Sequence, residues 1–258
     1  MKVFYFTATG NCLAAAKAIG GELISIPQAL RDETGAYKDD AIGFVFPVFD
    51  NTMPRIMREL LEAKKFAADY FFAVTTYGFF PGNTLSVFQK LAATHGIALD
   101  YSAELKMVDN YLPLFDVEKE IQKITEKKTD ETLARICADI AERKHALTRN
   151  TIFKSASALA LKPLLKKTDS GLAAHDFTVN GDCILCGTCA KVCPAGNITV
   201  KEQVAFADRC YSCFACLHAC PKNALHVKGE RSTKRWRNPE VKLKELLEAN
   251  NIKGNEKE

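Results

Sequence analysis

The sequence predicts an α/β protein, in which a doubly wound parallel sheet of five strands precedes a small, cysteine-rich α+β domain. Strand and helix patterns alternate through the first half of the chain, which favours a parallel sheet with helices on both faces. Eight of the ten cysteines then gather between Cys183 and Cys220. We divide the 258 residues into a sheet domain (1–148), an interdomain segment (149–178), a cysteine-rich domain (179–229) and a basic C-terminal extension (230–258).

Hydrophobic periodicity places the elements of the sheet domain. The expected strands cover residues 2–6, 22–26, 41–46, 70–76 and 98–107. The expected helices cover residues 11–20, 52–66, 83–95 and a long stretch from about 117 to 147. That stretch carries an apolar stripe at helical spacing, made of Leu133, Ile136, Cys137, Ile140 and Ala141. We interpret Cys137 as a small buried residue on the stripe. A further helix, packed between the domains, is expected within residues 152–165.

The eight clustered cysteines form two copies of one pattern, offset by 27 residues. Each copy reads C-x2-C-x2-C-x3-C-P, the spacing by which bacterial-type ferredoxins hold iron–sulfur clusters. The cysteines are Cys183, Cys186, Cys189 and Cys193 in the first run, and Cys210, Cys213, Cys216 and Cys220 in the second. Because thiolates are soft ligands that suit iron, the spacing predicts two 4Fe–4S clusters and one-electron transfer at low potential.

The fourth cysteine of each run binds the other cluster in two-cluster ferredoxins. This rule assigns Cys183, Cys186, Cys189 and Cys220 to cluster one, and Cys210, Cys213, Cys216 and Cys193 to cluster two. The exchange predicts that loss of either cluster unfolds both. The alternative is a pair of four-cysteine zinc sites, although zinc sites usually use paired knuckles rather than a run of three. We expect Tyr211 and Phe214 to shield cluster two from water, and His218 to be a partly exposed helix residue.

Composition limits the classes of function. Residues 1–146 carry 17 basic and 20 acidic side chains, whereas residues 147–258 carry 18 and 11. Two clusters contribute roughly −2 each, which leaves the second half only mildly basic and weakens a nucleic-acid interpretation. No apolar run approaches the roughly 20 residues of a transmembrane helix. The first residues are expected to be a strand and not a signal peptide, so we expect a cytoplasmic protein whose cysteines bind metal.

The loop after the first expected strand has the features of a phosphate-binding turn. Thr7-Ala8-Thr9-Gly10-Asn11-Cys12 lies between that strand and a helix, so backbone N–H groups and threonine hydroxyls can point at an anion. It is neither a Walker loop nor the dinucleotide motif G-x-G-x-x-G. The alternative from the residues alone is an ordinary helix N-terminus without a ligand.

The same loop matches T-x-T-G-N, the phosphate loop that flavodoxins use for FMN. Four further stretches carry a family resemblance. They are residues 43–49, 76–78 and 109–111, and residues 235–239 after the cysteine runs. Over nearly its whole length the chain resembles the flavodoxin–ferredoxin fusion proteins common in anaerobic bacteria. The resemblance implies a flavodoxin-like sheet of order 2-1-3-4-5.

The resemblance also implies the residues that bind FMN. The phosphate would be held by Thr7, Thr9, Gly10, Asn11 and Cys12. The isoalloxazine ring would be flanked by Pro47, Val48, Phe49, Thr76, Tyr77 and Gly78, with Asn110 nearby. Two residues depart from the family pattern. Cys12 stands where a hydroxyl residue is usual, and Phe49 where an aromatic with a hydroxyl is typical.

A flavin beside two clusters predicts an electron-transfer flavoprotein, because clusters pass single electrons and a flavin holds one or two. No G-x-G-x-x-G occurs, so we expect a protein redox partner and not a nicotinamide nucleotide. One alternative is a reductase whose flavin acts directly on a small acceptor such as a quinone or nitro compound. Another is an iron–sulfur sensor or nucleic-acid-binding protein, based on the basic run around Trp236. For that run a solvated face or a partner-docking strip is the simpler interpretation.

Overall fold

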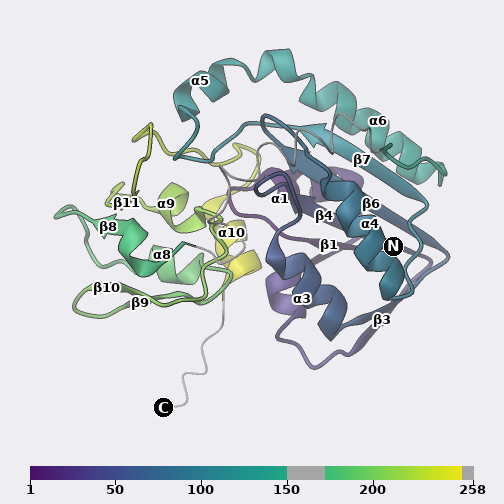
Figure 1. Ribbon diagram of the computed structural model, residues 1–258, viewed down its shortest axis with the longest axis horizontal. Helices are drawn as coiled ribbons and strands as arrows, with labels where there is room; N and C mark the ends of the chain where they lie inside the picture. The colour runs from purple at the N-terminus through teal and green to yellow at the C-terminus, as the bar shows by residue number, and fades with distance from the viewer. Residues whose placement is uncertain (150–171, 252–258) are drawn as a thin grey trace.

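A computed structural model describes residues 1–149 and 172–251 of the chain (Figure 1). The expected helix at 152–165, and most of the interdomain segment 149–178, lie outside these residues. Within the described ranges, no helix combines the length and the apolarity that crossing a membrane requires. The boundaries proposed for the four parts of the chain stay predictions.

The first part of the chain forms a parallel five-stranded sheet. Its strands are β1 (Lys2–Tyr5), β2 (Glu22–Ser25), β4 (Ala41–Pro47), β6 (Tyr70–Tyr77) and β7 (Tyr101–Lys106). They pair in the order β2-β1-β4-β6-β7, and all four pairings are parallel. Counted along the sheet, this is the order 2-1-3-4-5 of the flavodoxin-like fold, which confirms the predicted fold class.

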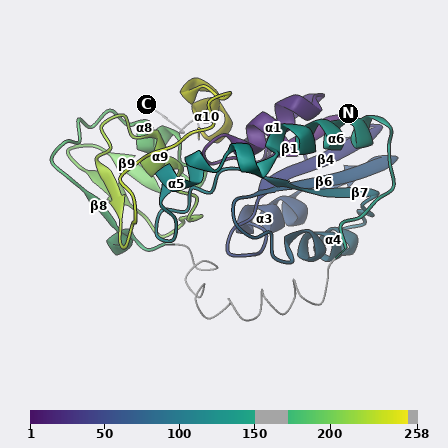
Figure 2. The same cartoon turned by 90° about the horizontal axis from the view of Figure 1, so that it is seen from above.

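Alternating side chains of the strands fill two cores, one on each face of the sheet. Val3 and Tyr5 face a core that includes Leu13 of α1 (Asn11–Ile19) and Ile136 of α6 (Thr129–Ala141). Phe4 points to the other side of the sheet and faces the opposite core, together with Ile42 and Phe44 of β4. That core is covered by α2 (Ile26–Ala29), α3 (Arg55–Ala63) and α4 (Thr84–Thr94). Figure 2 shows α1 and α6 on one side of the sheet, and α3 and α4 on the other.

Three features of this part differ from the sequence-based expectation. The short helix α2 begins at Ile26, where only the end of a strand was expected. The long helix expected over 117–147 is divided into α5 (Val117–Gln122), a 3-10 turn η1 (Thr125–Lys127) and α6. The break falls at Lys128, whose φ of 47° is left-handed. A short parallel pair, β3 (Ala36–Lys38) with β5 (Lys65–Ala67), was not expected.

The apolar stripe of α6 is only partly buried. Ile136 and Ile140 are buried, Leu133 packs against them, and Ala141 is exposed. Cys137 is half-buried and therefore not the fully enclosed residue that we expected.

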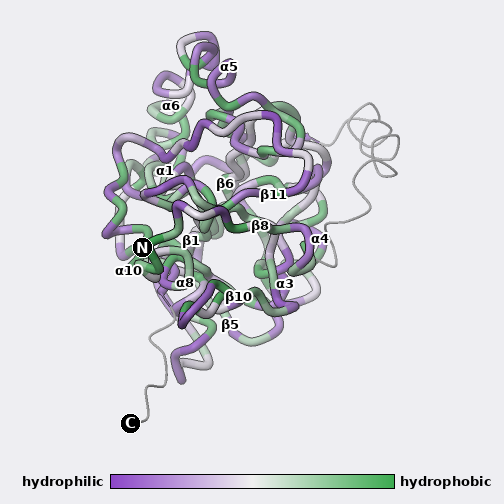
Figure 3. The backbone as a smooth tube through the Cα atoms, turned by 90° about the vertical axis from the view of Figure 1, so that its left-hand side faces the viewer, coloured by the Kyte–Doolittle hydropathy of each residue, from purple (hydrophilic) through white to green (hydrophobic). Residues whose placement is uncertain are grey.

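The second part of the chain is small and built from short elements. Two antiparallel pairs join β8 (Phe177–Val179) with β11 (Leu225–Val227), and β9 (Ile198–Val200) with β10 (Val204–Phe206). Its helices are a 3-10 turn η3 (Ala174–Asp176), α8 (Thr188–Lys191) and α9 (Ala215–Ala219). The chain then returns to the sheet domain, where α10 (Leu243–Asn250) packs beside α2. Figure 3 views the molecule from the side of this part, where hydrophilic and hydrophobic stretches alternate along the tube.

Candidate functional site

The loop between β1 and α1 is held in a defined shape by its own side chains. Gly10 precedes α1 with a φ of 105°, a conformation that residues with a Cβ rarely adopt. The N–H of Gly10 donates to Thr7 Oγ1 at 3.1 Å, and Asn110 Nδ2 donates to Thr9 Oγ1 at 2.5 Å. Both threonine hydroxyls act as acceptors in these bonds, so each still has its own hydrogen to donate. The predicted loop residues are therefore preorganised at the N-terminus of a helix.

This loop forms one end of a cavity of about 250 Å³. All the residues predicted to bind FMN line it except Gly10. The remaining lining residues are Ala8, Asp50, Asn51, Phe79, Phe80, Val108, Asp109, Tyr111, Leu114, Phe115, Ser212, Cys213 and Phe214. Sequence reasoning missed the apolar wall of Phe79, Phe80 and Phe115, since a single sequence does not indicate which loops meet in space. The grouping supports the predicted residues, whose role in binding stays a prediction.

The two departures from the family pattern have local explanations. Cys12 is buried, and its Sγ lies 3.0 Å from Thr76 Oγ1, so the thiol bonds to the end of strand β6. Burial raises the pKa of Cys12 to about 12, and the bond to Thr76 opposes the shift. Cys12 is therefore a neutral thiol. Phe49 lies on the cavity wall, with its ring 6.1 Å from that of Phe6.

A half-buried carboxyl group, that of Asp109, joins two of the cavity loops. Asp109 Oδ1 accepts the N–H of Tyr111 at 3.1 Å. A Cβ on Gly78 would lie 2.2 Å from the Asp109 Cβ, so only glycine lets these loops approach. Burial raises the pKa of Asp109, and bonds from the backbone of Tyr111 and Phe79 oppose that shift.

Two smaller cavities in the second part of the chain are each lined by four cysteines. One is lined by Cys183, Cys186, Cys189 and Cys220, and the other by Cys193, Cys210, Cys213 and Cys216. Each group therefore takes three cysteines from one run and the fourth from the other run, as the sequence rule predicts. Four convergent thiolates are the ligand set of a 4Fe–4S cluster, so the residues present fit that group. Among the described residues, no three His, Cys, Asp or Glu side chains lie close enough together to hold a single metal ion directly.

The backbone repeats with the same 27-residue offset as the cysteines. Positive φ angles occur in pairs at Leu185 and Ser212, Gly187 and Phe214, and Gly196 and Asn223. N–H groups donate to cysteine sulfur at equivalent places, from Asn197 to Cys193 and from Ala224 to Cys220. In iron–sulfur proteins, N–H bonds to cluster sulfurs help to set the reduction potential. The two runs are thus duplicate structures, and Phe214 holds a strained conformation where its counterpart is glycine.

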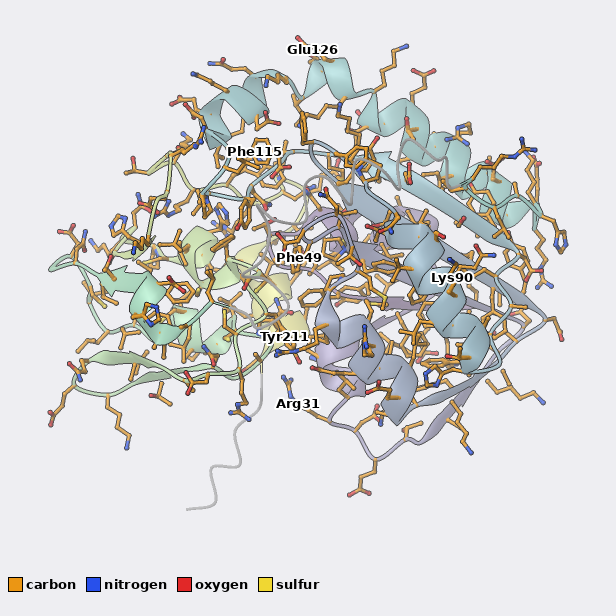
Figure 4. The ribbon with its side chains drawn as sticks, in the orientation of Figure 1. Arg31, Phe49, Lys90, Phe115, Glu126 and Tyr211 are labelled. Atoms are coloured by element: carbon orange, nitrogen blue, oxygen red, sulfur yellow. The ribbon has the colours of Figure 1, made fainter. Side chains whose placement is uncertain are left out.

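The large cavity shares a wall with cluster cavity two, which is the cavity lined by Cys193, Cys210, Cys213 and Cys216. Cys213 and Phe214 line both of them, and the Phe214 ring lies 5.3 Å from that of Tyr111. Tyr211 lines cluster cavity two, as predicted for a shielding residue. Its hydroxyl donates to Glu59 Oε2 at 2.5 Å, and Arg55 lies over its ring at 4.9 Å. Figure 4 shows Tyr211 and Phe49 where the two parts of the chain meet.

His218 is buried, contrary to the partly exposed position that we expected. Its Nδ1 accepts the N–H of Trp236 at 3.2 Å, so Nε2 carries the hydrogen that bonds the carbonyl of Asn110 at 2.9 Å. Burial lowers the pKa of His218 to about 4, which keeps the ring neutral. His218 therefore links the cluster helix α9 to a loop of the large cavity. No spacing in the sequence indicates this role.

The basic extension is not a uniformly solvated strip. Trp236 and Asn238 are buried, and Arg235 pairs with Glu230 at 3.1 Å. The exposed basic residues of the run are Lys228, Arg231, Lys234 and Arg237. Trp236 is thus unavailable as an exposed stacking surface. The general tendency of tryptophan to be buried could have indicated this.

Residues 156–239 match the family model of the 4Fe-4S dicluster domain, which covers about a third of the chain. The polyferredoxin protein MvhB of Methanothermus fervidus is 51% identical over 45 residues, which are 17% of this chain and 11% of that protein. A component of the ion-translocating oxidoreductase complex of Methanosarcina acetivorans is 44% identical over 48 residues, 18% of each. The matches thus span under a fifth of these curated relatives.

A solved flavodoxin from the domain Archaea is similar to the first part of the chain. The identity is 19%, over 55% of this chain and 97% of that chain, with a TM-score of 0.33. At that score the similarity adds nothing to the strand order, on which the fold assignment rests.

The fold and the cysteine sites together define a chain with a flavodoxin-like sheet domain and a cysteine-rich part that matches a 4Fe-4S dicluster domain. The second part is a dicluster domain, which holds two 4Fe–4S clusters. This two-part arrangement is similar to that expected of flavodoxin–ferredoxin fusion proteins.

Proposed function

We propose that this protein transfers electrons between a low-potential donor and an acceptor through two 4Fe–4S clusters and a bound FMN. The observation that carries the proposal is the shared wall: Cys213, assigned to cluster two, also lines the cavity of the phosphate loop. When bound, the clusters pass single electrons and FMN holds one or two. The protein could therefore gather single electrons and deliver pairs, or do the reverse.

The chain's own residues would hold the flavin in three ways. Thr7 and Thr9 would donate hydroxyl hydrogens to the phosphate, and the N-terminus of α1 favours a negative charge there. Phe49 and Tyr77 would pack against the ring system. Pro47, Val48 and Asn110 also line the cavity, where the carbonyl of Val48 and the side chain of Asn110 would bond polar edges of the flavin, since the N–H of Val48 already donates to the Thr76 carbonyl at 2.8 Å.

The clusters differ in their access to solvent. In cluster one, Cys186 is exposed, and the neighbouring Ile184 and Leu185 are 58% and 43% exposed. In cluster two, Cys193 and Cys216 are buried. This difference supports a route in which a redox partner protein meets cluster one, and cluster two stands next to the flavin.

Anaerobic purification with cofactor analysis tests the proposal. We expect about eight irons and one FMN per chain. Thr9→Val, which removes one loop hydroxyl, should lower the FMN content. Thr94→Val, at an exposed position of α4, should not. Adding a one-electron donor to the holoprotein should reduce clusters and flavin in sequence. Iron far below about eight, or FMN content unaffected by Thr9→Val, would contradict the assignment.

A second candidate is direct reduction of a small apolar acceptor at the flavin. It is favoured by exposed apolar residues on the cavity wall, where Phe79 is 68% and Leu114 46% exposed. Leu114→Glu should slow reoxidation of the reduced protein by a small quinone if this candidate is correct. Equal reoxidation rates in the variant and the wild type would exclude this surface as the acceptor site.

A further inference from the structure

Residues 236–251, here called the C-terminal segment, contact the phosphate loop from outside the cavity. Asn238, Val241 and Asn250 of this segment are buried. None of them lines the cavity. Figures 1 and 2 show α10 returning from the cluster domain to lie near α1. The segment therefore touches the loop without occupying the space of a ligand.

Its asparagines bond the main chain of the loop. The N–H of Asn238 donates to the Thr9 carbonyl at 2.8 Å. Asn250 Nδ2 donates to the Thr7 carbonyl at 3.0 Å. Because a trans peptide is planar, with C=O and N–H pointing in opposite directions, each bond also fixes the direction of the next N–H. These are the N–H group of Ala8 and that of Gly10, which donates to Thr7 Oγ1 at 3.1 Å.

A side-chain contact adds to these bonds. Asn238 Nδ2 donates to Asn11 Oδ1 at 3.3 Å, while Asn238 Oδ1 accepts the N–H of Glu240 at 3.0 Å. A Cβ on Gly10 would lie 2.9 Å from the Asn238 Cβ and 3.1 Å from the Val241 Cβ. The segment thus packs directly against the glycine of the loop, so the loop's shape depends on residues far along the chain.

We propose that Asn238 and Asn250 are positioning residues of the FMN phosphate site. This inference rests on the proposed function and deepens it. The segment serves the phosphate end of the ligand and not its ring, because its contacts are with Thr7, Thr9 and Asn11. Because these contacts order the loop before the ligand binds, less conformational entropy is lost on binding, and the affinity is higher.

A comparison of FMN with riboflavin, which lacks the phosphate, tests the proposal on full-length protein with its clusters in place and its flavin removed. Asn250→Ala removes the side-chain bond to the Thr7 carbonyl, so it should raise the FMN Kd by roughly tenfold and leave the riboflavin Kd unchanged. Asn238→Ala loses only the bond to Asn11, because its main-chain N–H still donates to Thr9, so it should raise the FMN Kd less and also leave the riboflavin Kd unchanged. Asn238→Asp keeps the acceptor for Glu240 but loses the donor to Asn11 and adds a negative charge. Its loss of FMN affinity should be larger. Lys244→Ala, on an 84% exposed side chain of α10, is the matched control and should change neither Kd.

The outcomes separate the two claims. Equal losses of FMN and riboflavin affinity in Asn238→Ala would show that Asn238 only supports the fold, and would overturn the positioning role. An unchanged FMN Kd in both Asn238 variants would overturn it as well. Wild-type protein that binds FMN no more tightly than riboflavin would instead overturn the proposed phosphate site. Iron content and circular dichroism report whether each variant is folded.

Discussion

The two parts of the chain solve the problem of stability differently. The largest fully buried side chains, among them Tyr70, Phe72 and Phe88, all belong to the sheet domain. The cluster domain has strand pairs of three residues each and buries mainly small side chains and cysteines. Small domains with little core need staples such as metal sites. The sheet domain should therefore fold through its own core, whereas the cluster domain should depend on iron.

The largest effect is expected on removing one cluster ligand. Cys220→Ser takes a ligand from cluster one, although Cys220 belongs to the second run. Because the runs exchange ligands, both clusters should be lost, and iron should fall from about eight toward zero. The far-ultraviolet signal of the sheet domain should persist. Retention of about four irons would show that the clusters assemble independently.

Gly43→Ala should lower the stability of the sheet domain. A Cβ at Gly43 would lie 2.1 Å from the ring of Phe72, inside the sheet core. Overpacking of this kind costs about 1–3 kcal/mol, so the unfolding midpoint of the sheet domain should fall by several degrees. Gly35→Ala, where nothing lies within 4 Å of the added Cβ, is the control. Iron content should stay the same in both variants, and a loss of iron in Gly43→Ala would mean that the parts do not fold separately.

Phe214→Gly addresses the wall where the two parts meet. Phe214 has a φ of 57°, and left-handed backbone costs an ordinary residue about 1–2 kcal/mol, so glycine should relieve strain. Removal of the ring should nevertheless expose cluster two and speed its bleaching in air. Leu185→Gly, at a φ of 53° in the first run, gains the same backbone freedom but opens the cavity of cluster one instead. Bleaching of cluster two at the wild-type rate in Phe214→Gly would argue against shielding by Phe214.

The smallest effect is expected from pH. Glu120 bonds Lys127 at 2.8 Å, and Lys127 also donates to the Met107 carbonyl. Burial acts to raise the pKa of Glu120, but bonds from Lys127 and Lys123 outweigh it and lower the pKa. A lowered folded-state pKa stabilises the fold above the unfolded value, and this stability is lost as pH falls through the folded pKa. Glu120→Gln should therefore flatten the fall in sheet-domain stability at acidic pH, measured by urea unfolding from pH 7 downward. An identical slope would show that Glu120 contributes nothing.

The sequence was informative wherever a local pattern carries the structure. The unbroken apolar run Val3–Phe6 indicates a strand buried on both faces, and the cysteine spacing predicts which four sulfurs line each cluster cavity. Features that depend on contacts with residues far along the chain were not predicted. The helix break at Lys128 accompanies the bonds of the buried Lys127 to Glu120 and Met107, which periodicity does not reveal. The burial of His218 likewise depends on Asn110, 108 positions earlier.

The contact between Asn11 and Asn238 spans 227 positions, which has a consequence for biosynthesis. At ribosomal speeds, the loop emerges on the order of tens of seconds before its supporting residues. During that interval the first domain can form its sheet while its ligand loop lacks the bonds from Asn238 and Asn250. A nascent chain arrested before residue 238 should thus be folded but poor at retaining flavin, so acquisition of the cofactor would follow translation of the cluster domain.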